Sequence, residues 1–117
     1  MLRTKLTLVV LVACLSLIGA GSAQAATKLI GTVGPGFTIT LKQGTKKVTT
    51  LKPGTYTLVI KDLSGIHNFH LTGPGVNKAT GIAFKGTKTF TIKVRKGSYK
   101  YVCDPHALAM TGAFKVG

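Results

Sequence analysis

The sequence predicts an all-β domain, and three observations carry this prediction. Apolar and polar side chains alternate throughout Phe37–Leu41 and Phe90–Val94 and in part of Tyr56–Ile60, segments whose β-branched and aromatic residues suit a half-buried strand. Turn-forming glycines and prolines recur at short intervals between such segments. No stretch of eleven or more residues after the first quarter of the chain has a helical period. Short strands at this spacing predict an antiparallel sandwich or barrel.

The expected elements alternate regularly along the chain. The turns between strands are predicted at Gly34-Pro35-Gly36, Gln43-Gly44, Lys52-Pro53-Gly54, Gly73-Pro74-Gly75, Lys85-Gly86 and Lys96-Gly97. Segments 53–60 and 96–103 resemble each other, and each is predicted to be a tight turn that leads into a core strand. Because residues two apart in a strand share a face, Cys103 lies on the same face as Tyr99 and Tyr101. If the tyrosines point into the core, Cys103 does so too, at the end of its strand.

The first 25 residues have the order of a secretory signal peptide. Arg3 and Lys5 precede the apolar run Leu6–Ile18, and Ala23-Gln24-Ala25 supplies the small residues of a cleavage site. The run of 13 residues is shorter than the roughly 18 to 20 that span a bilayer, so no transmembrane segment is expected. We therefore predict an exported protein, periplasmic, extracellular or in the cell envelope, that divides into a cleaved signal peptide, residues 1–25, and one domain, residues 26–117.

A second processing signal overlaps the first. Leu11-Val12-Ala13-Cys14 resembles a bacterial lipobox, in which Cys14 would become the lipidated first residue and tether the protein to a membrane surface. The apolar run continues to Ile18, where a lipoprotein ordinarily turns polar. Cleavage after Ala25 is therefore favoured over a lipid anchor at Cys14.

The chain is strongly basic. It has 16 lysines and arginines and only two acidic residues, Asp62 and Asp104, and removal of Arg3 and Lys5 leaves a net charge of +12. Such a field attracts acidic redox proteins and anionic membrane or cell-wall surfaces, whereas the expected export argues against nucleic acid. Because the lysines are scattered along strands and turns, a specific electrostatic partner and a generally solvated surface fit the sequence equally well. We expect a monomer.

The residue content argues against an enzyme. The sequence has no glycine-rich phosphate loop, no carboxylate pair and no serine triad. With two acidic residues in the whole chain, general acid and base catalysis has few candidates. A hydrolase is therefore not expected.

Cysteine use points to a metal site. An exported protein ordinarily pairs its cysteines, yet only Cys103 remains once the signal peptide is removed. His106 and Met110 follow Cys103 in one loop, and thiolate, imidazole and thioether are donors that select copper. Two histidines, one cysteine and a weak axial methionine describe a blue-copper electron-transfer site. Met110 taken alone fits equally well as a core residue that fills a gap.

One further ligand must come from elsewhere, and His67 is the preferred choice. Strand alternation places His67 and Phe69 on one face and Asn68 and His70 on the other, so the two histidines are not expected at one ion. Alternation alone leaves either histidine open. His70 is expected to be a surface or hydrogen-bonding residue.

Together these residues resemble the cupredoxins. Tyr99-x-Tyr101-x-Cys103-x-Pro105-His106-x-x-x-Met110-x-Gly112 is similar to the carboxy-terminal copper loop of plastocyanin, pseudoazurin and amicyanin, and His67-Asn68 is similar to their upstream ligand segment. The resemblance covers residues 28–117. It implies a Greek-key β-sandwich of seven or eight strands that holds one type 1 copper ion, Cu(I) or Cu(II), near one end.

The resemblance also implies a role for each residue. His67, Cys103 and His106 would be the strong equatorial ligands, and Met110 the weak axial one. Asn68 would hydrogen-bond across to the loop that contains Cys103 and join the two segments. His70 matches a histidine of amicyanin that does not bind the metal.

Two positions depart from the family pattern. Three residues separate His106 from Met110, a length between those of the amicyanin and plastocyanin loops. Asp104 stands where the family often has serine or threonine. Its carboxylate beside the thiolate would favour Cu(II) and lower the reduction potential if it stays ionised.

The expected function is the transfer of single electrons between redox partners. The resemblance implies that electrons leave through the edge of His106, whose neighbours would form a docking patch with turns 34–36 and 73–75: Pro105, Ala107, Leu108 and Ala109. One alternative is an extracytoplasmic carrier or buffer that binds copper without redox turnover. Another is an adhesion or wall-associated sandwich in which Cys103 is incidental.

Overall fold

The structure is a computed structural model that describes residues 25–117. The predicted signal peptide, apart from Ala25, and the lipidation signal at Cys14 lie outside the described residues. Both sheets and the core between them come from residues 27–116, so a chain that begins at Ala26 contains the whole sandwich. Among the described residues, no helix is long and apolar enough to cross a membrane.

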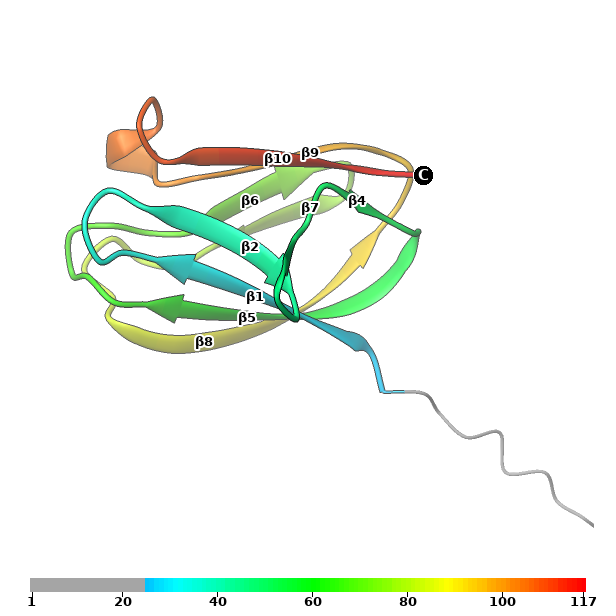
Figure 1. Ribbon diagram of the computed structural model, residues 1–117, viewed down its shortest axis with the longest axis horizontal. Helices are drawn as coiled ribbons and strands as arrows, with labels where there is room; N and C mark the ends of the chain where they lie inside the picture. The colour runs from blue at the N-terminus through cyan, green and yellow to red at the C-terminus, as the bar shows by residue number, and fades with distance from the viewer. Residues whose placement is uncertain (1–24) are drawn as a thin grey trace, which may run out of the picture.

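Ten strands of the described chain form two five-stranded sheets that pack face to face (Figure 1). Sheet A has the order β3-β2-β1-β5-β8, and sheet B has the order β4-β10-β9-β6-β7. The strands are β1 (Thr27–Val33), β2 (Ile39–Gln43), β3 (Lys46–Lys47), β4 (Thr50–Leu51), β5 (Gly54–Asp62), β6 (His70–Gly73), β7 (Val76–Ala79), β8 (Gly86–Val94), β9 (Gly97–Val102) and β10 (Thr111–Val116). A 3-10 turn, η1 (Asp104–His106), lies between β9 and β10. The predicted all-β sandwich is confirmed, but it has ten strands and not seven or eight, because the two-residue strands β3 and β4 add to the longer ones.

The strands form where alternation predicted them. The segments 56–60 and 90–94 lie inside β5 and β8, and 37–41 overlaps β2. In β5, the buried side chains Tyr56, Leu58 and Ile60 alternate with more exposed ones, as expected of a strand with one face on the core. Both sheets are nevertheless mixed, because β1 runs parallel to β5 and β10 runs parallel to β4. The prediction of a purely antiparallel sandwich is therefore wrong. After β3 the chain crosses to sheet B at β4, and β5 then returns to sheet A beside β1 and runs in the same direction as β1.

Aromatic side chains of sheet B fill the core beneath the loop that follows β9. Tyr99, Tyr101 and Cys103 are all buried, as the shared face predicted. The ring of Tyr101 stacks on Phe69 with centroids 5.4 Å apart, and the ring of Tyr99 stacks on Phe114 at 5.1 Å. This packing fixes the direction in which β9 delivers Cys103 to the end of the sandwich.

Candidate metal centre

Three side chains that can bind a metal meet at one end of the sandwich. His67 comes from the segment between β5 and β6, Cys103 directly follows β9, and His106 ends η1. The Nδ1 atoms of the two histidines are 3.0 Å apart, and the Sγ atom of Cys103 is 3.7 Å from Nδ1 of His67 and 3.6 Å from Nδ1 of His106. Nitrogen and sulfur ligands bind ions such as zinc at about 2.0–2.3 Å, so ligands of one ion lie about 3–4 Å apart. The three donor atoms therefore fit a single ion, and their chemistry fits copper.

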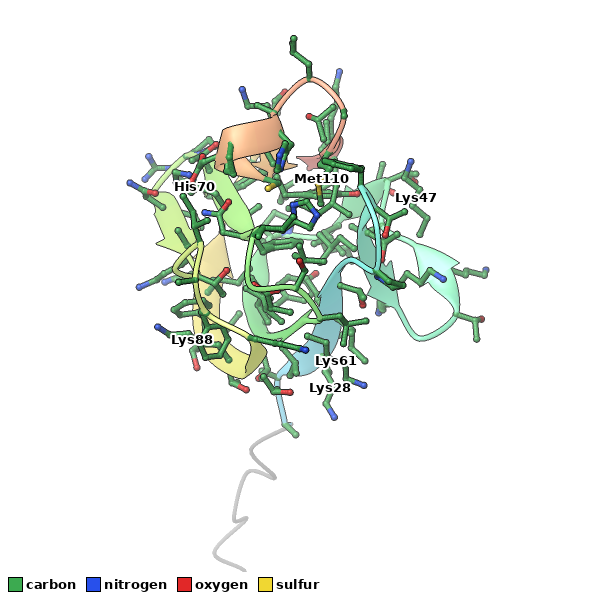
Figure 2. All side chains as sticks on the ribbon, turned by 90° about the vertical axis from the view of Figure 1, so that its left-hand side faces the viewer. Lys28, Lys47, Lys61, His70, Lys88 and Met110 are labelled. Carbon is green, nitrogen blue, oxygen red and sulfur yellow. The ribbon has the colours of Figure 1, made fainter. Side chains whose placement is uncertain are left out.

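The loop between β9 and β10 owes its shape to four backbone hydrogen bonds, one of which runs from the N–H of Ala109 to the carbonyl of His106 at 3.1 Å. The N–H of His106 donates to the carbonyl of Cys103 at 3.0 Å, and the N–H of Met110 donates to the carbonyl of His106 at 2.9 Å. The N–H of Cys103 donates in turn to the carbonyl of Met110 at 3.0 Å. Pro105 fits the first turn of η1, where its missing N–H costs no hydrogen bond. Met110 is fully buried at this end of the molecule (Figure 2), and its backbone is hydrogen-bonded to Cys103 and His106, the two donor residues of its own loop.

Burial separates the inner and outer parts of the cluster. Cys103 and His67 are 0% and 2% exposed, whereas His106 is half-buried and has an edge near solvent. Phe37 covers both imidazoles, with its ring centroid 5.3 Å from that of His67 and 4.9 Å from that of His106. The sequence pattern placed Phe37 in a strand, but it lies in the loop before β2 and is 59% exposed. Its position after the Gly34-Pro35-Gly36 turn was the available sign that it belongs to a loop.

Asn68 joins the segment that carries His67 to the loop that carries Cys103. Its backbone N–H donates to Sγ of Cys103 at 3.4 Å. Its side-chain oxygen accepts the backbone N–H of Asp104 at 2.7 Å, and its Nδ2 donates to the carboxylate of Asp104 at 2.8 Å and to the carbonyl of Thr80 at 3.2 Å. Strand alternation predicted Asn68 on the face opposite His67, yet residues 67–69 precede β6 and are all buried. The Asn68 side chain can be buried because its amide oxygen and nitrogen are both hydrogen-bonded.

Thr80 supports the same segment from the other side, and nothing in the sequence pattern marked it. Its N–H donates to the carbonyl of Phe69 at 3.0 Å, and its Oγ1 accepts the N–H of Phe69 at 2.9 Å. Thr80 is 3% exposed and follows β7 directly. It reaches Phe69 because β6 and β7 pair, a contact that a single sequence does not reveal.

His70 lies outside the cluster and contacts Asp104 instead. Its Nδ1 is 2.9 Å from a carboxylate oxygen of Asp104, and its Nε2 is 2.7 Å from the side-chain oxygen of Asn77. The hydrogen bond to Asp104 raises the pKa of His70 above its ordinary value, with partial burial opposing and the bond to Asn77 adding to the rise. Burial alone would raise the pKa of Asp104, but hydrogen bonds from Asn68 and His70 outweigh it and lower that pKa. The structure thus brings His67, and not His70, together with Cys103 and His106.

Four loops form the surface around the cluster, and we call this surface the metal end. They are residues 34–38, 63–69, 80–85 and 103–110. Every large hydrophobic side chain that the described chain exposes lies in these loops: Phe37, Leu63, Ile66, Ile82 and Leu108. Leu108 is 100% exposed, and the loops contain only two fully charged residues, Lys85 and Asp104. The metal end is therefore an apolar surface on an otherwise cationic protein.

One part of the predicted docking patch is wrong. The turn Gly73-Pro74-Gly75 lies at the opposite end of the sandwich, because β6 begins at the metal end with His70 and runs away from it. The carbonyl of Pro74 accepts a hydrogen bond from the hydroxyl of Tyr99 at 3.1 Å, near the start of β9. The turn at 34–36 does lie at the metal end, directly before Phe37.

Comparison with known proteins agrees with this geometry. The profile of the copper binding proteins of the plastocyanin/azurin family matches residues 36–117. The chain therefore belongs to this family, the cupredoxins, as the copper-loop motif predicted. A search of curated protein sequences found no significant match.

Solved structures of rusticyanin share the fold. A point variant of rusticyanin has 22% sequence identity and a TM-score of 0.57, with 80% of each chain covered. Reduced rusticyanin has 24% identity and a TM-score of 0.56, covering 80% of this chain and 81% of that chain. Rusticyanin from Thiobacillus ferrooxidans has 25% identity and a TM-score of 0.54, covering 80% of this chain and 79% of that chain. The family and the His67, Cys103 and His106 cluster are together compatible with one copper ion.

Proposed function

We propose that this protein is an exported, single-domain type 1 copper protein that carries single electrons between redox partners. The observation that carries the proposal is the convergence of one thiol and two imidazoles within 4.8 Å of one another in a copper-binding fold. Cupredoxins carry electrons and are generally not enzymes. The chain has only two acidic side chains, which leaves few groups for general acid and base catalysis and agrees with that role. In the proposed site, His67, Cys103 and His106 would hold the ion, and Met110 would supply a fourth, weaker ligand.

Bound copper supplies a one-electron couple between Cu(I) and Cu(II). The protein contributes a rigid set of donors, because the loop hydrogen bonds hold Cys103 and His106 in place before any ion binds. The buried backbone N–H of Asn68 donates to the Cys103 sulfur at 3.4 Å and so helps to fix the position of that sulfur. Phe37 and the core exclude water from Cys103 and His67. These features favour electron transfer over copper carriage, which requires an ion that can be handed to a partner.

The apolar metal end fits the contact through which electrons would pass. His106 is the only one of the three clustered side chains with an edge near solvent, and Leu108 and Phe37 flank it. Redox encounters use small, weak interfaces that form and separate quickly. An acidic redox protein would be attracted by the positive field of the whole chain and would then dock on this surface.

Copper addition tests the electron-transfer proposal. Cu(II) added to the chain that begins at Ala26 should give intense blue absorption, which ascorbate removes and an oxidant restores. Cys103→Ser should abolish the colour, whereas the control His70→Ala should keep it, because His70 lies outside the cluster. Met110→Leu should keep the colour and change the reduction potential. A colourless Cu(I) complex would favour a copper carrier, and no binding at all would eliminate both functions.

Export has its own test, which is independent of copper. The mass of the protein recovered from its native compartment should correspond to a chain that begins near Ala26. A diacylated chain beginning at Cys14 would replace free export by lipid anchoring.

A further inference from the structure

The two outer faces of the sandwich carry unequal numbers of lysines. Pairing between the strands places five exposed lysines on the outer face of sheet A: Lys28, Lys42, Lys47, Lys61 and Lys93. The outer face of sheet B carries two, Lys100 and Lys115, among small, polar and apolar residues. Figure 2 shows Lys28 and Lys61 projecting from the same side of the molecule, away from Met110. This asymmetry favours a preferred contact on the outer face of sheet A over a uniformly solvated surface.

The rest of the sheet A face is short and polar. Seven threonines lie between the lysines: Thr32, Thr40, Thr55, Thr57, Thr87, Thr89 and Thr91. Ile30 and Val59 are the aliphatic residues among them, and both are half-buried. Five strands spaced about 4.8 Å apart make this face about 20 Å wide. It is a broad surface of ammonium and hydroxyl groups with no aromatic side chain.

No carboxylate neutralises these charges. Asp62 points into the core and is 1% exposed, and Asp104 lies at the metal end beside His70. The described chain has no other acidic residue. Lys42 and Lys47 even stand directly opposite each other in the pairing of β2 and β3, an arrangement that destabilises a sheet when no anion lies between the charges. The face thus has the charge pattern of a surface that meets a negative partner.

The composition of the face indicates which anionic partner fits. Protein interfaces gain most of their affinity from buried aromatic and arginine side chains, and this face has neither. Single-stranded nucleic acid is held by aromatic stacking, which is also absent from the face. Lysines bind phosphate as point charges, and lysine clusters are attracted to anionic lipid surfaces. A fluid layer of phosphates can also adjust to a broad array of lysines without a groove to enclose it.

We propose that the outer face of sheet A docks on anionic phospholipid bilayers. The metal end lies at the end of the strands, whereas the docking surface is a side of the sandwich (Figure 1). The bound protein therefore keeps Leu108 and the edge of His106 free for a partner that diffuses along or protrudes from the same bilayer. Docking and electron transfer use separate surfaces, so neither blocks the other.

Vesicle binding tests the proposal with charge-matched variants of the chain that begins at Ala26. The probe is vesicles of three parts phosphatidylcholine to one part phosphatidylglycerol, compared with pure phosphatidylcholine, at low and high NaCl. The face variant changes Lys28, Lys42, Lys47, Lys61 and Lys93 to glutamine. The control variant changes five other exposed lysines to glutamine: Lys78, Lys85, Lys96, Lys100 and Lys115.

The wild-type chain should bind the anionic vesicles, bind pure phosphatidylcholine poorly, and dissociate at high salt. The face variant should lose at least about a hundredfold in vesicle affinity, because each lysine near an anionic bilayer contributes about fivefold. The control variant should lose less than about tenfold although its net charge is the same. Leu108→Ser should bind vesicles as the wild type does, because the apolar metal end is not the docking surface.

Three results would overturn the proposal. Equal losses in the two lysine variants would mean that net charge, and not this face, drives binding. Loss of vesicle binding in Leu108→Ser would move the contact to the metal end. Tighter binding of the sheet A face to soluble polyglutamate than to anionic vesicles would identify an acidic protein as the partner. None of these results depends on copper, so they leave the electron-transfer proposal untouched.

Discussion

Asn68 and Asp104 are joined by two hydrogen bonds that run in opposite directions. The side-chain oxygen of Asn68 accepts the backbone N–H of Asp104 at 2.7 Å, and its Nδ2 donates to the carboxylate of Asp104 at 2.8 Å. This pair connects the segment that carries His67 to the loop that carries Cys103 and His106. The carboxylate of Asp104 is thus occupied by Asn68 and His70, which explains structurally why an acid stands at this position.

Replacement of Asn68 by alanine should destabilise the copper-free protein by about 2 kcal/mol. The substitution removes three side-chain hydrogen bonds and leaves the carbonyl of Thr80 without the N–H that now reaches it. Urea denaturation measures the loss. Asn77→Ala is the matched control, because Asn77 is exposed and its side chain bonds only to His70 among the described residues. A control loss as large as that of Asn68→Ala would show that the bridge to Asp104 is not special.

A positive charge at Leu108 should slow electron exchange between two copies of the protein. Two molecules that exchange an electron through His106 must bring their metal ends together, and Leu108 is the most exposed side chain there. Leu108→Lys places like charges opposite each other and should reduce the self-exchange rate about tenfold or more at low salt. Line broadening in mixtures of the Cu(I) and Cu(II) forms reports the rate.

Ala113→Lys supplies the matched control for this experiment. Ala113 is exposed on the outer face of sheet B, so the variant has the same net charge with the addition outside the four loops of the metal end. We expect a change of less than about threefold, since the added charge lies outside the contact between the two metal ends and does not face a like charge across it. Equal slowing by the two variants would remove the metal end from the exchange route.

The contact between His70 and Asp104 should stabilise the protein in a limited pH range. The pKa of His70 is raised from 6.5, so its contribution is complete below that value and is lost as pH rises through the raised pKa. The pKa of Asp104 is lowered from 3.8, so its contribution is present above that value and is lost as pH falls through the lowered pKa. The pair therefore contributes most between about pH 4 and 6.5, by at most about 1 kcal/mol because both side chains are partly exposed.

The pH dependence of His70→Gln tests this contact. The difference in unfolding free energy between the copper-free wild type and the variant should be largest near pH 5 and should shrink by pH 8. A difference that stays constant over this range would mean that the contact works through hydrogen bonding alone and does not involve a charged imidazole.

Neutralising Asp62 should stabilise the protein at pH 7, whereas neutralising Asp104 should destabilise it. It is 1% exposed, its Oδ1 accepts the N–H of Ser64 at 3.0 Å, and its Oδ2 has no hydrogen-bond partner. Burial raises the pKa of Asp62, and the bond from Ser64 and the nearby His67 only partly offset this. A raised acid pKa means that stability is complete when the group is protonated and is lost as pH rises through the folded pKa.

Asp62→Asn should therefore stabilise the copper-free protein by about 1 kcal/mol at pH 7 and change little near pH 3. Asp104→Asn should destabilise it at pH 7, because it removes the partner of His70. Urea denaturation at both pH values measures the two effects. A loss of stability in Asp62→Asn at pH 7 would show that the buried carboxylate is charged and favourably compensated.

Local patterns predicted the features that depend on neighbours in the sequence. The alternation in 90–94 and the shared face of Tyr99, Tyr101 and Cys103 required only strand geometry, and the structure has both. The loop from Cys103 to Met110 is likewise closed by bonds within eight residues. Because a thiol, an imidazole and a thioether lie in one short loop, the sequence alone indicated a copper site there.

Features that depend on distant pairing could not be predicted in the same way. Thr80 and Asn77 reach the site because β7 pairs with β6, and Phe37 reaches the histidines because separate loops meet at the metal end. The parallel pairing of β1 with β5 also joins segments that are distant in the sequence, so no local pattern predicted it. The lysines appear scattered in the sequence, yet the register of sheet A brings five of them to one face.

Gly112 belongs to the copper-loop motif, and the pairing of β10 with β9 explains why this position has no room for a side chain. It stands opposite Tyr101 in the pairing of β10 with β9, and a Cβ atom at this position would overlap the Tyr101 ring. That ring cannot move aside freely, because it stacks on Phe69 with the planes 7° apart. Gly112→Ala should therefore displace Tyr101 and strain the end of β9, where Cys103 follows two residues later.

We expect Gly112→Ala to lower the unfolding free energy by about 2–3 kcal/mol, the cost of overpacking a core, and to lower Tm by about 10 °C. The variant should also bind copper less tightly, because a shift of Tyr101 moves Cys103 relative to His67. Gly65→Ala is the matched control, since its added Cβ would meet only the carbonyl of Ala83 at 3.9 Å and its backbone is unstrained. Thermal unfolding and copper titration of both variants provide the measurements. Equal stability of the two would mean that the Tyr101 ring can yield, and the aromatic stack would then not be what positions Cys103.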